Sequence, residues 1–348
     1  MRFVFILICL LSVSAAAQSG RVKPGESPAP SPTPKRGVYV PATDRPRTVD
    51  PNATPTPKKD EDDVIKVDST LVPIPVSVLD QSGRAVTNLK LSDFELRIDG
   101  QPAEIAELFR SESPIRLAML FDNSSSVRVA REFEKEAAVR FFKHIIRPEK
   151  DLAALFSVAT TTRLEQGLTR DVSSLTNAIE NFPQPEGATA LLDGIAKAAN
   201  YLAGVEGRRV IIIVSDGDDT VSDMTFEEMI RVVQVANCQV YVIKTTEFEN
   251  YKRTGVRGGN ANIRQLSAER RMIELAKQTG GAVYSPIDET ELDRAFALVS
   301  AELAQQYILS YYPEAETQKR GEFREISLTL KARSNVSVRT RKGYYVPK

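Results

Sequence analysis

The sequence predicts an α/β protein: a doubly wound, mostly parallel sheet inserted in a small antiparallel β-sandwich formed by the flanking segments. Three observations predict this fold. Between residues 113 and 303, continuous apolar runs alternate with helical patterns, as in a parallel sheet that is buried on both faces. On either side of this region apolar and polar residues alternate, which is typical of half-buried antiparallel strands. Neither flank has enough strands for a stable sheet, so we expect the two flanks to pair.

The N-terminus has the layout of a secretory signal peptide. Arg2 precedes an apolar run from Phe3 to Val13, and the small residues Ala15–Ala17 follow. We therefore expect a signal peptide at 1–17 and an exported protein, either periplasmic or extracellular at the cell surface. The apolar run is much shorter than the roughly twenty residues that span a bilayer, so no transmembrane segment is expected after cleavage. Cleavage also removes Cys9 and leaves Cys238, which lies in an apolar segment and is expected to be a buried thiol.

Residues 18–63 are rich in proline and have almost no large apolar side chains. Such a segment buries too little surface to offset the entropy lost on ordering. Its prolines favour an extended chain. We predict a disordered linker here.

The predicted sandwich has two parts, residues 64–112 and residues 304–348. The first part has alternating apolar residues on either side of a turn at Asp80–Gly83, and the second has the same texture. Tyrosines gather in the second part, where we expect them to fill the core rather than form a binding surface. The apolar positions are Leu71, Ile74, Val76, Val78, Phe94, Leu96 and Ile98 in the first part, and Tyr307–Tyr311, Ile326, Leu328, Leu330, Val336 and Val338 in the second.

The central α/β domain is predicted to cover residues 113–303. Strands are expected at Ile115–Phe121, Ala153–Val158, Val210–Val214, Val240–Ile243 and Ala282–Tyr284. Helices are expected near 130–146, 172–181, 190–203, 225–236, 267–279 and 289–303. The basic, glycine-containing stretch Lys252–Arg271 is interpreted as a long loop between a strand and its helix.

Polar residues that can bind a metal follow the predicted strands. In open α/β sheets, ligands bind beyond the carboxyl ends of the strands. Asp122-Asn123-Ser124-Ser125-Ser126 follows the first strand, Asp216 follows the strand that ends at Val214, and Thr189 opens a helix between them. All of these side chains offer oxygen, and Mg²⁺ prefers about six oxygens, of which one or two come from carboxylates.

These residues resemble the metal-ion-dependent adhesion site of the von Willebrand factor A family, which consists of Asp-x-Ser-x-Ser, a later threonine and a later aspartate. The resemblance implies that Mg²⁺, or Mn²⁺, is held by Asp122, Ser124, Ser126, Thr189 and Asp216. It also implies that the ion binds a partner protein through an Asp or Glu carboxylate. The flanking strands resemble those of exported acidobacterial "VWFA-related" proteins, through Asp93-Phe94 and Asp99-Gly100, and this second resemblance implies no activity.

Simpler interpretations remain for several of these residues. The segment Asp122–Ser126 on its own is also typical of a helix cap. Asp193 either orients the Thr189 loop or is a solvated helix residue. Asp218 and Asp219 either tune the site or belong to a charged turn.

Other function classes are disfavoured. The 46 basic and 46 acidic residues balance, so nothing points to nucleic acid. His144 stands alone without a nucleophile, and no phosphate-binding loop is present. We therefore expect a binding module and not an enzyme. The alternatives are a structural component of an envelope assembly, with a non-essential metal site, and a Mg²⁺-dependent hydrolase. The sequence does not indicate the ligand or the oligomeric state.

Overall fold

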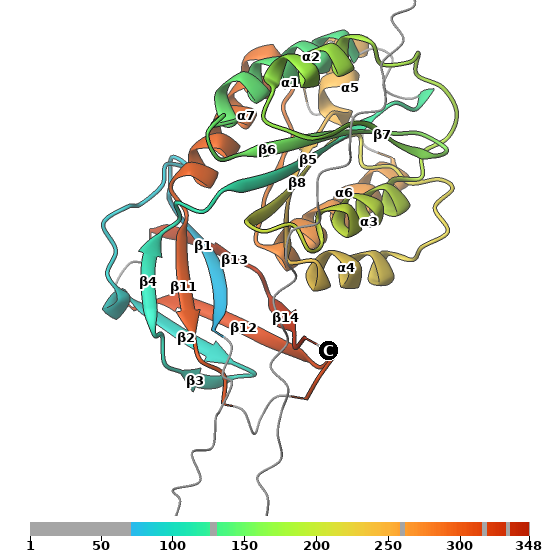
Figure 1. The fold of residues 1–348 in the computed structure, drawn as a ribbon. Helices are drawn as coiled ribbons and strands as arrows, with labels where there is room; N and C mark the ends of the chain where they lie inside the picture. The colour runs from blue at the N-terminus through green and yellow to red at the C-terminus, as the bar shows by residue number, and fades with distance from the viewer. Residues whose placement is uncertain (1–70, 126–130, 258–261, 315–318, 332–334, 348) are drawn as a thin grey trace, which may run out of the picture. The chain divides into compact units, whose positions relative to one another are not determined.

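The computed structural model describes residues 71–125, 131–257, 262–314, 319–331 and 335–347 (Figure 1). The predicted signal peptide and proline-rich linker lie outside these residues. The described residues all belong to one compact unit. Among the described helices, none has the length and apolar character needed to cross a membrane.

A six-stranded sheet forms the centre of the α/β region, in the order β10-β9-β8-β5-β6-β7. All neighbouring strands in it run parallel except β6 and β7, which are antiparallel. The central strands read as continuous apolar runs because both faces of the sheet are covered. The strands are β5 (Ile115–Asp122), β6 (Leu152–Val158), β7 (Thr162–Thr169), β8 (Arg208–Ser215), β9 (Cys238–Lys244) and β10 (Val283–Tyr284).

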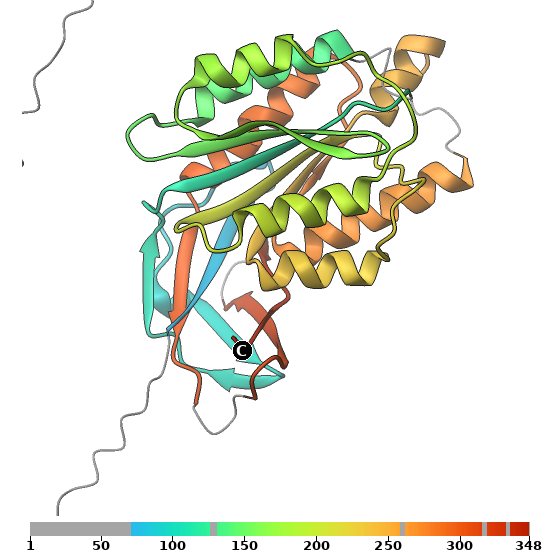
Figure 2. The same ribbon diagram turned by 45° about the vertical axis from the view of Figure 1, so that its right-hand side comes forward.

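Helices cover both faces of this sheet (Figures 1 and 2). One face carries α1 (Arg131–Ile145), α2 (Val172–Glu180) and α7 (Glu289–Ala304), and the other carries α3 (Leu191–Leu202), α4 (Phe226–Val235) and α6 (Ile263–Thr279). Each set of helices packs its own apolar core against the sheet. The doubly wound arrangement predicted from the sequence is confirmed.

Two antiparallel sheets share a third apolar core. Their strand orders are β13-β1-β11-β4 and β14-β12-β2-β3. Strands from before and after the α/β region pair directly, β1 with β11 and β2 with β12, so the fold class is confirmed in this respect as well. The domain boundaries stay a prediction. The elements are β1 (Val72–Asp80), a 3-10 turn at Leu91–Asp93, β2 (Phe94–Ile98), β3 (Gln101–Ala103), β4 (Glu107–Arg110), β11 (Tyr307–Tyr311), β12 (Phe323–Leu330), β13 (Val336–Thr340) and β14 (Gly343–Tyr345).

Most of the C-terminal tyrosines are core residues, as predicted. Tyr307, Tyr311 and Tyr344 are buried in the core shared by the two antiparallel sheets. Tyr345 is only half-buried, and Tyr312 is 58% exposed.

The prediction of a loop over Lys252–Arg271 is wrong for most of its described residues. Helix α5 (Thr246–Thr254) reaches into this range and ends at Gly255, whose φ of 69° provides the left-handed cap. Helix α6 begins after Asn262, whose side chain accepts a hydrogen bond from the backbone of Gln265 and so forms a capping box. Residues 258–261 lie outside the described part.

Candidate metal centre

The predicted metal residues follow two adjacent strands. Strands β5 and β8 are hydrogen-bonded neighbours, with Phe121 opposite Val214. The chain leaves β5 toward α1 on one face and leaves β8 toward α4 on the other, so this is the topological switch point of the sheet, where ligands bind in open α/β sheets. Ser215 Oγ donates a 2.7 Å hydrogen bond to Asp122 Oδ2, which joins the two strand ends directly.

The loop after β5 folds back onto its first carboxylate. The backbone N–H of Ser124 donates to Asp122 Oδ1 at 2.9 Å, and Asp122 and Ser124 are each only 2% exposed. This bond places the Ser124 residue next to the Asp122 carboxylate, as the Asp-x-Ser pattern requires. Ser126, the last predicted ligand on this loop, lies outside the described residues.

Thr189 is held between the loops after β5 and β8. Its backbone N–H donates to Thr220 Oγ1 at 2.9 Å, and its carbonyl oxygen accepts from Thr220 N at 2.8 Å. Just before it, Glu186 N donates to Asn123 O at 3.0 Å. Thr189 is 4% exposed. The structure therefore brings the Thr189 loop into contact with both of the loops that carry the predicted carboxylates.

A glycine allows this close approach. Gly187 has a φ of +78°, which side-chain-bearing residues rarely adopt, and a Cβ atom there would lie 2.6 Å from Thr160 Oγ1. The Gly187 carbonyl oxygen accepts from Ser125 N at 3.3 Å. A larger residue would push the Thr189 loop away from the strand ends.

Negative charge accumulates at this edge of the sheet. Burial and the charge of Asp216 raise the pKa of Asp122 to about 6. Asp216 itself is half-buried at the end of β8, and its Oδ1 accepts from Asp218 N at 2.9 Å. Two carboxylates held so close together in a low-dielectric site repel each other, and a bound cation would relieve that repulsion.

Sequence reasoning missed two further acids. Glu134 on α1 is 1% exposed, and neither of its carboxylate oxygens has a hydrogen-bond partner. Burial, followed by the charges of Glu249 and Asp122, raises its pKa well above the usual range, although the nearby Thr245 side chain favours the charged form. Glu249 on α5 has a pKa raised to about 8 by burial and by the charges of Asp216 and Asp122. Both acids therefore lie close enough to Asp122 for their charged forms to interact with its carboxylate.

The Glu134 carboxylate had a detectable sequence signal. On α1, buried residues recur at Glu134, Ala137, Ala138, Phe141 and Ile145, which is the spacing of a single helix face. An acid on the apolar face of a helix is unusual because a buried charge needs a partner. Glu249 offers no comparable signal, because the short helix α5 is polar on most of its surface.

Asp219 and Asp193 lock the loops around Thr189. Helix α3 has no side-chain cap of its own at Ala190, and instead Asp219 accepts hydrogen bonds from Leu191 N at 2.8 Å and Leu192 N at 3.2 Å. In return, Asp193 on α3 accepts from the backbone N–H groups of Asp223 and Met224, each at 3.0 Å. Asp193 therefore holds the segment at Asp223 and Met224 and is not merely solvated, and Asp219 caps α3.

Asp218 makes an ion pair with helix α6. Its Oδ2 lies 2.6 Å from Arg264 Nε. The Asp218 side chain is thereby drawn toward α6, so the structure gives it no role as a direct ligand.

The oxygen atoms of the predicted ligands suit a hard cation that binds to only one or two charged side chains. Among the described residues, no group of three or more His, Cys, Asp or Glu side chains is arranged to hold a metal ion. A site with two aspartates and several hydroxyl groups meets the demand of Mg²⁺ for one or two carboxylates and other oxygen ligands, whereas it lacks the thiolates and imidazoles that favour zinc.

Two other reactive side chains in the described chain have structural roles. His144 Nδ1 lies 2.7 Å from the Arg140 carbonyl oxygen one turn back on α1. Cys238 is free and buried, and burial raises the pKa of its thiol to about 12, which confirms the expected inert thiol.

Comparison with solved structures gives matches at low sequence identity. A variant of the PilB minor pilin from Streptococcus sanguinis matches at 12% identity and a TM-score of 0.44, over 57% of this chain and 63% of the pilin. BatB from Bacteroides thetaiotaomicron matches at 16% and 0.44, over 55% and 98%. A von Willebrand factor type A protein from Catenulispora acidiphila matches at 11% and 0.46, over 81% and 76%.

A search of curated proteins finds no match. The family model of the von Willebrand factor type A domain matches residues 117–218. This stretch runs from β5 to the loop after β8 and includes every predicted metal ligand. The narrower resemblance to acidobacterial proteins stays a prediction. Residues 117–218 of this chain match the von Willebrand factor type A domain, and this stretch carries the candidate metal centre.

Proposed function

We propose that this chain is an exported binding module that recognises an acidic group on a partner protein through a divalent cation, Mg²⁺ or Mn²⁺. The ion would be held by Asp122, Ser124, Ser126, Thr189 and Asp216. The observation that carries the proposal is the buried Asp122 carboxylate. It accepts hydrogen bonds from the Ser215 and Ser124 side chains and lies close to the charge of Asp216.

The charge count favours a partner that brings a carboxylate. Only two of the five proposed protein ligands carry a formal charge, so the bound ion would stay electrophilic and accept a further anionic oxygen. Glu134 and Glu249 do not change this count in the metal-free protein near neutral pH, because their raised pKa values favour the protonated form.

The geometry favours binding over catalysis. In the described part of the chain, His144 contacts a carbonyl oxygen and Cys238 stays protonated, so neither supplies an activated nucleophile or general base. The role proposed for this chain's own residues is to position one ion and to leave room beside it.

Thermal unfolding tests the metal step. The wild-type protein, Asp122→Ala and the control Asp223→Ala are unfolded with Mg²⁺, with Mn²⁺ and with chelator. Asp223 is an exposed residue of the same loop region. An ion at a hundred times its Kd adds about 2.7 kcal/mol of stability. We expect this gain in wild type and in the control but not in Asp122→Ala. No response in wild type would contradict the proposal.

A second measurement tests recognition. An immobilised glutamate-rich peptide and its glutamine-rich counterpart serve as probes, with Mg²⁺ or with chelator. Retention on the glutamate peptide alone, and only with Mg²⁺, supports the proposed mode. A protein that binds Mg²⁺ but ignores both peptides would instead favour the structural alternative.

A further inference from the structure

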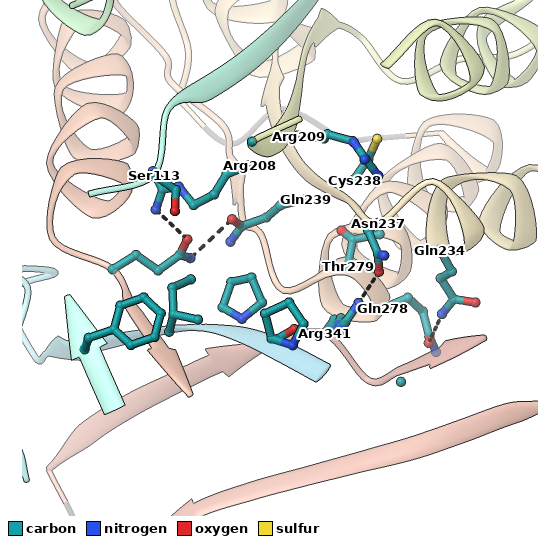
Figure 3. Close-up of a pocket in the computed structure, with 17 residues that line it drawn as sticks. Ser113, Arg208, Arg209, Gln234, Asn237, Cys238, Gln239, Gln278, Thr279 and Arg341 are labelled. Atoms are coloured by element: carbon teal, nitrogen blue, oxygen red, sulfur yellow. Dashed lines mark hydrogen bonds between the residues drawn. The ribbon is translucent and has the colours of Figure 1, made fainter. Parts of the chain in front are cut away.

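A separate pocket lies at the opposite end of the parallel sheet from Asp122. It has a volume of about 360 Å³ and lies between the first residues of β8 and β9 and the antiparallel strands β1, β4 and β11 (Figure 3). Strand β8 begins with Arg208 at the pocket and ends at Ser215 beside the metal centre. At about 3.3 Å per residue the two sites are roughly 25 Å apart.

Three arginines line this pocket, and they are called the arginine cluster below: Arg208, Arg209 and Arg341. Figure 3 shows Arg208 and Arg209 on the side of β8 and Arg341 on the side of the antiparallel strands. No Asp or Glu is among the residues that line the pocket. The lining therefore carries three positive charges and no negative charge.

The hydrogen bonds of the arginine cluster go to neutral oxygens. Arg208 donates to Gln306 Oε1 at 3.0 Å and to a carbonyl of α7 at 2.6 Å. Arg209 donates to two backbone carbonyls at 2.9 and 2.8 Å, and Arg341 donates to Asn237 Oδ1 and to the Pro73 carbonyl oxygen. These bonds fix the guanidinium groups in place, but none of them goes to a carboxylate; the Arg341 guanidinium also lies 5.5 Å from the centre of the Tyr344 ring.

The charges are also poorly hydrated. Burial lowers the pKa of both Arg208 and Arg341 to about 10, and the Nε atom of each is buried without a hydrogen-bond partner. Removing a cation from water without supplying an anion costs free energy. An anion bound in the pocket would offset this cost.

The rest of the lining is amide-rich on one side and apolar on the other. Gln234 pairs with Gln278, and Gln239 pairs with Gln306, so these amides are held in fixed positions (Figure 3). The apolar wall contains Pro73, Pro75, Phe109 and Ile308. The pocket is within the size range of small-molecule sites, which are mostly apolar with a few polar groups that fix orientation.

We infer that this pocket binds a small organic anion, with the acidic group against the arginine cluster and the apolar part against the proline and phenylalanine wall. Arginine suits carboxylates and phosphates equally because its planar fork donates two parallel hydrogen bonds to either. The Cys238 thiol in the lining stays protonated, so the site binds its ligand without attacking it.

Calorimetric titration of the full chain with three matched probes tests the inference: benzoate, phenyl phosphate and the neutral benzamide. We expect both anions, or one of them, to bind, and benzamide to bind at least about tenfold more weakly, since charge-assisted hydrogen bonds are roughly twice as strong as neutral ones. The stronger anion identifies the acidic group as carboxylate or phosphate. Equal binding of benzamide, or no binding of either anion, would overturn the inference.

Variants locate the site. Arg209→Gln is expected to weaken anion binding by about tenfold, whereas Arg209→Lys keeps the charge but loses the planar fork and should weaken binding less. Phe109→Ala tests the apolar wall, since Phe109 is 45% exposed and tolerates replacement. Arg163→Gln, which removes an exposed charge on β7, is the matched control. If Arg163→Gln weakens the anion as much as Arg209→Gln does, the binding is non-specific and the inference fails.

Anion binding in this pocket is expected to be independent of the candidate metal centre. Chelator should leave anion binding unchanged, and thermal unfolding checks that each variant is folded. Side-chain amide signals of Gln234, Gln239 and Gln306 should shift in NMR spectra on addition of the anion, and unshifted signals would contradict binding at this pocket.

Discussion

The two ends of the parallel sheet gather ionisable side chains of opposite kind, with carboxyl groups at one end and arginines at the other. At the carboxyl end, Asp122 and Glu134 are buried near the charges of Asp216 and Glu249. At the amino end, the arginine cluster faces a pocket without a carboxylate. The same strand, β8, connects the two ends. Uncompensated charge is costly when it is removed from water, so we propose a ligand of opposite charge at each end.

Asp216→Asn is expected to have the largest effect on the carboxyl end of the sheet. It removes one of the two proposed metal ligands that carry a charge. Because replacing even an outer-shell partner lowers metal affinity by about 10–100-fold, we expect Asp216→Asn to lower it by more than about 100-fold. Without metal, the variant should be more stable than wild type because the repulsion with Asp122 is relieved. Mn²⁺ titration and thermal unfolding measure both effects, with Asp223→Asn as the control. Unchanged metal affinity would exclude Asp216 as a ligand.

Asp151 is a useful contrast because it is a carboxylate at the amino end of the sheet whose charge is balanced by Arg147. It accepts hydrogen bonds from Ile115 N at 2.8 Å and from the Arg147 backbone and side chain. Burial acts to raise its pKa, but these bonds outweigh burial and lower it. Asp151→Asn should cost about 1–3 kcal/mol of unfolding free energy.

The lowered pKa of Asp151 also determines how its contribution to folding stability changes with pH. A depressed carboxyl pKa stabilises the fold above the unfolded value, near 3.9, and this contribution is lost as the pH falls through the lower folded value. Denaturant unfolding at several pH values should show wild type losing its advantage over Asp151→Asn in strong acid. A constant difference down to the lowest pH would contradict the assignment.

Asp219→Ala separates positioning from binding. It removes the side chain that caps α3, which should cost about 1 kcal/mol of stability. Because α3 carries the Thr189 loop, we also expect metal affinity to fall about tenfold. Denaturation and Mn²⁺ titration check the two effects, with Asp223→Ala as the control. A variant that loses stability but keeps its affinity would show that Thr189 is positioned without this cap.

The smallest expected effect is proton release. In the metal-free protein, Asp122 and Glu249 have pKa values raised to about 6 and about 8, so they hold protons that a bound cation would displace. Metal affinity should therefore fall as the pH drops from 8 to below 6. Calorimetry in buffers of different ionisation enthalpy should detect on the order of one proton released per ion at pH 7. Affinity independent of pH would show that these carboxyl groups are already ionised.

The metal-free protein should show the opposite trend in stability. A raised carboxyl pKa means that the folded state binds the proton more tightly than the unfolded state does. Stability without metal should therefore decrease as the pH rises from about 4 through 6.

The sequence was most informative where burial was complete. Strands β5, β8 and β9 are nearly continuous apolar runs, and their predicted positions agree with the structure to within two residues. Strand β7 was missed because it is a half-exposed edge strand whose residues, Thr162–Thr169, show no apolar run. Helix α5 was missed because it is short and largely polar, so tertiary contacts rather than a hydrophobic pattern explain it.

The candidate metal centre was predictable in part. The positions of Asp122, Thr189 and Asp216 follow from the rule that strand ends gather at one edge of the sheet. The sequence leaves the roles of Asp219 and Asp193 open between two alternatives each, because these roles depend on hydrogen bonds between residues about thirty positions apart. The arginine cluster was equally hidden, since Arg341 joins Arg208 and Arg209 only through the tertiary fold.

Counting bound Mn²⁺ by electron paramagnetic resonance tests the central claim most directly. Wild-type protein and Asp122→Asn are titrated with Mn²⁺, and the free-ion signal reports how much is bound. The account predicts a single bound ion per wild-type chain and none at the same concentration for Asp122→Asn. Equal binding by both proteins, or none by wild type, would contradict a metal centre at the carboxyl end of the sheet.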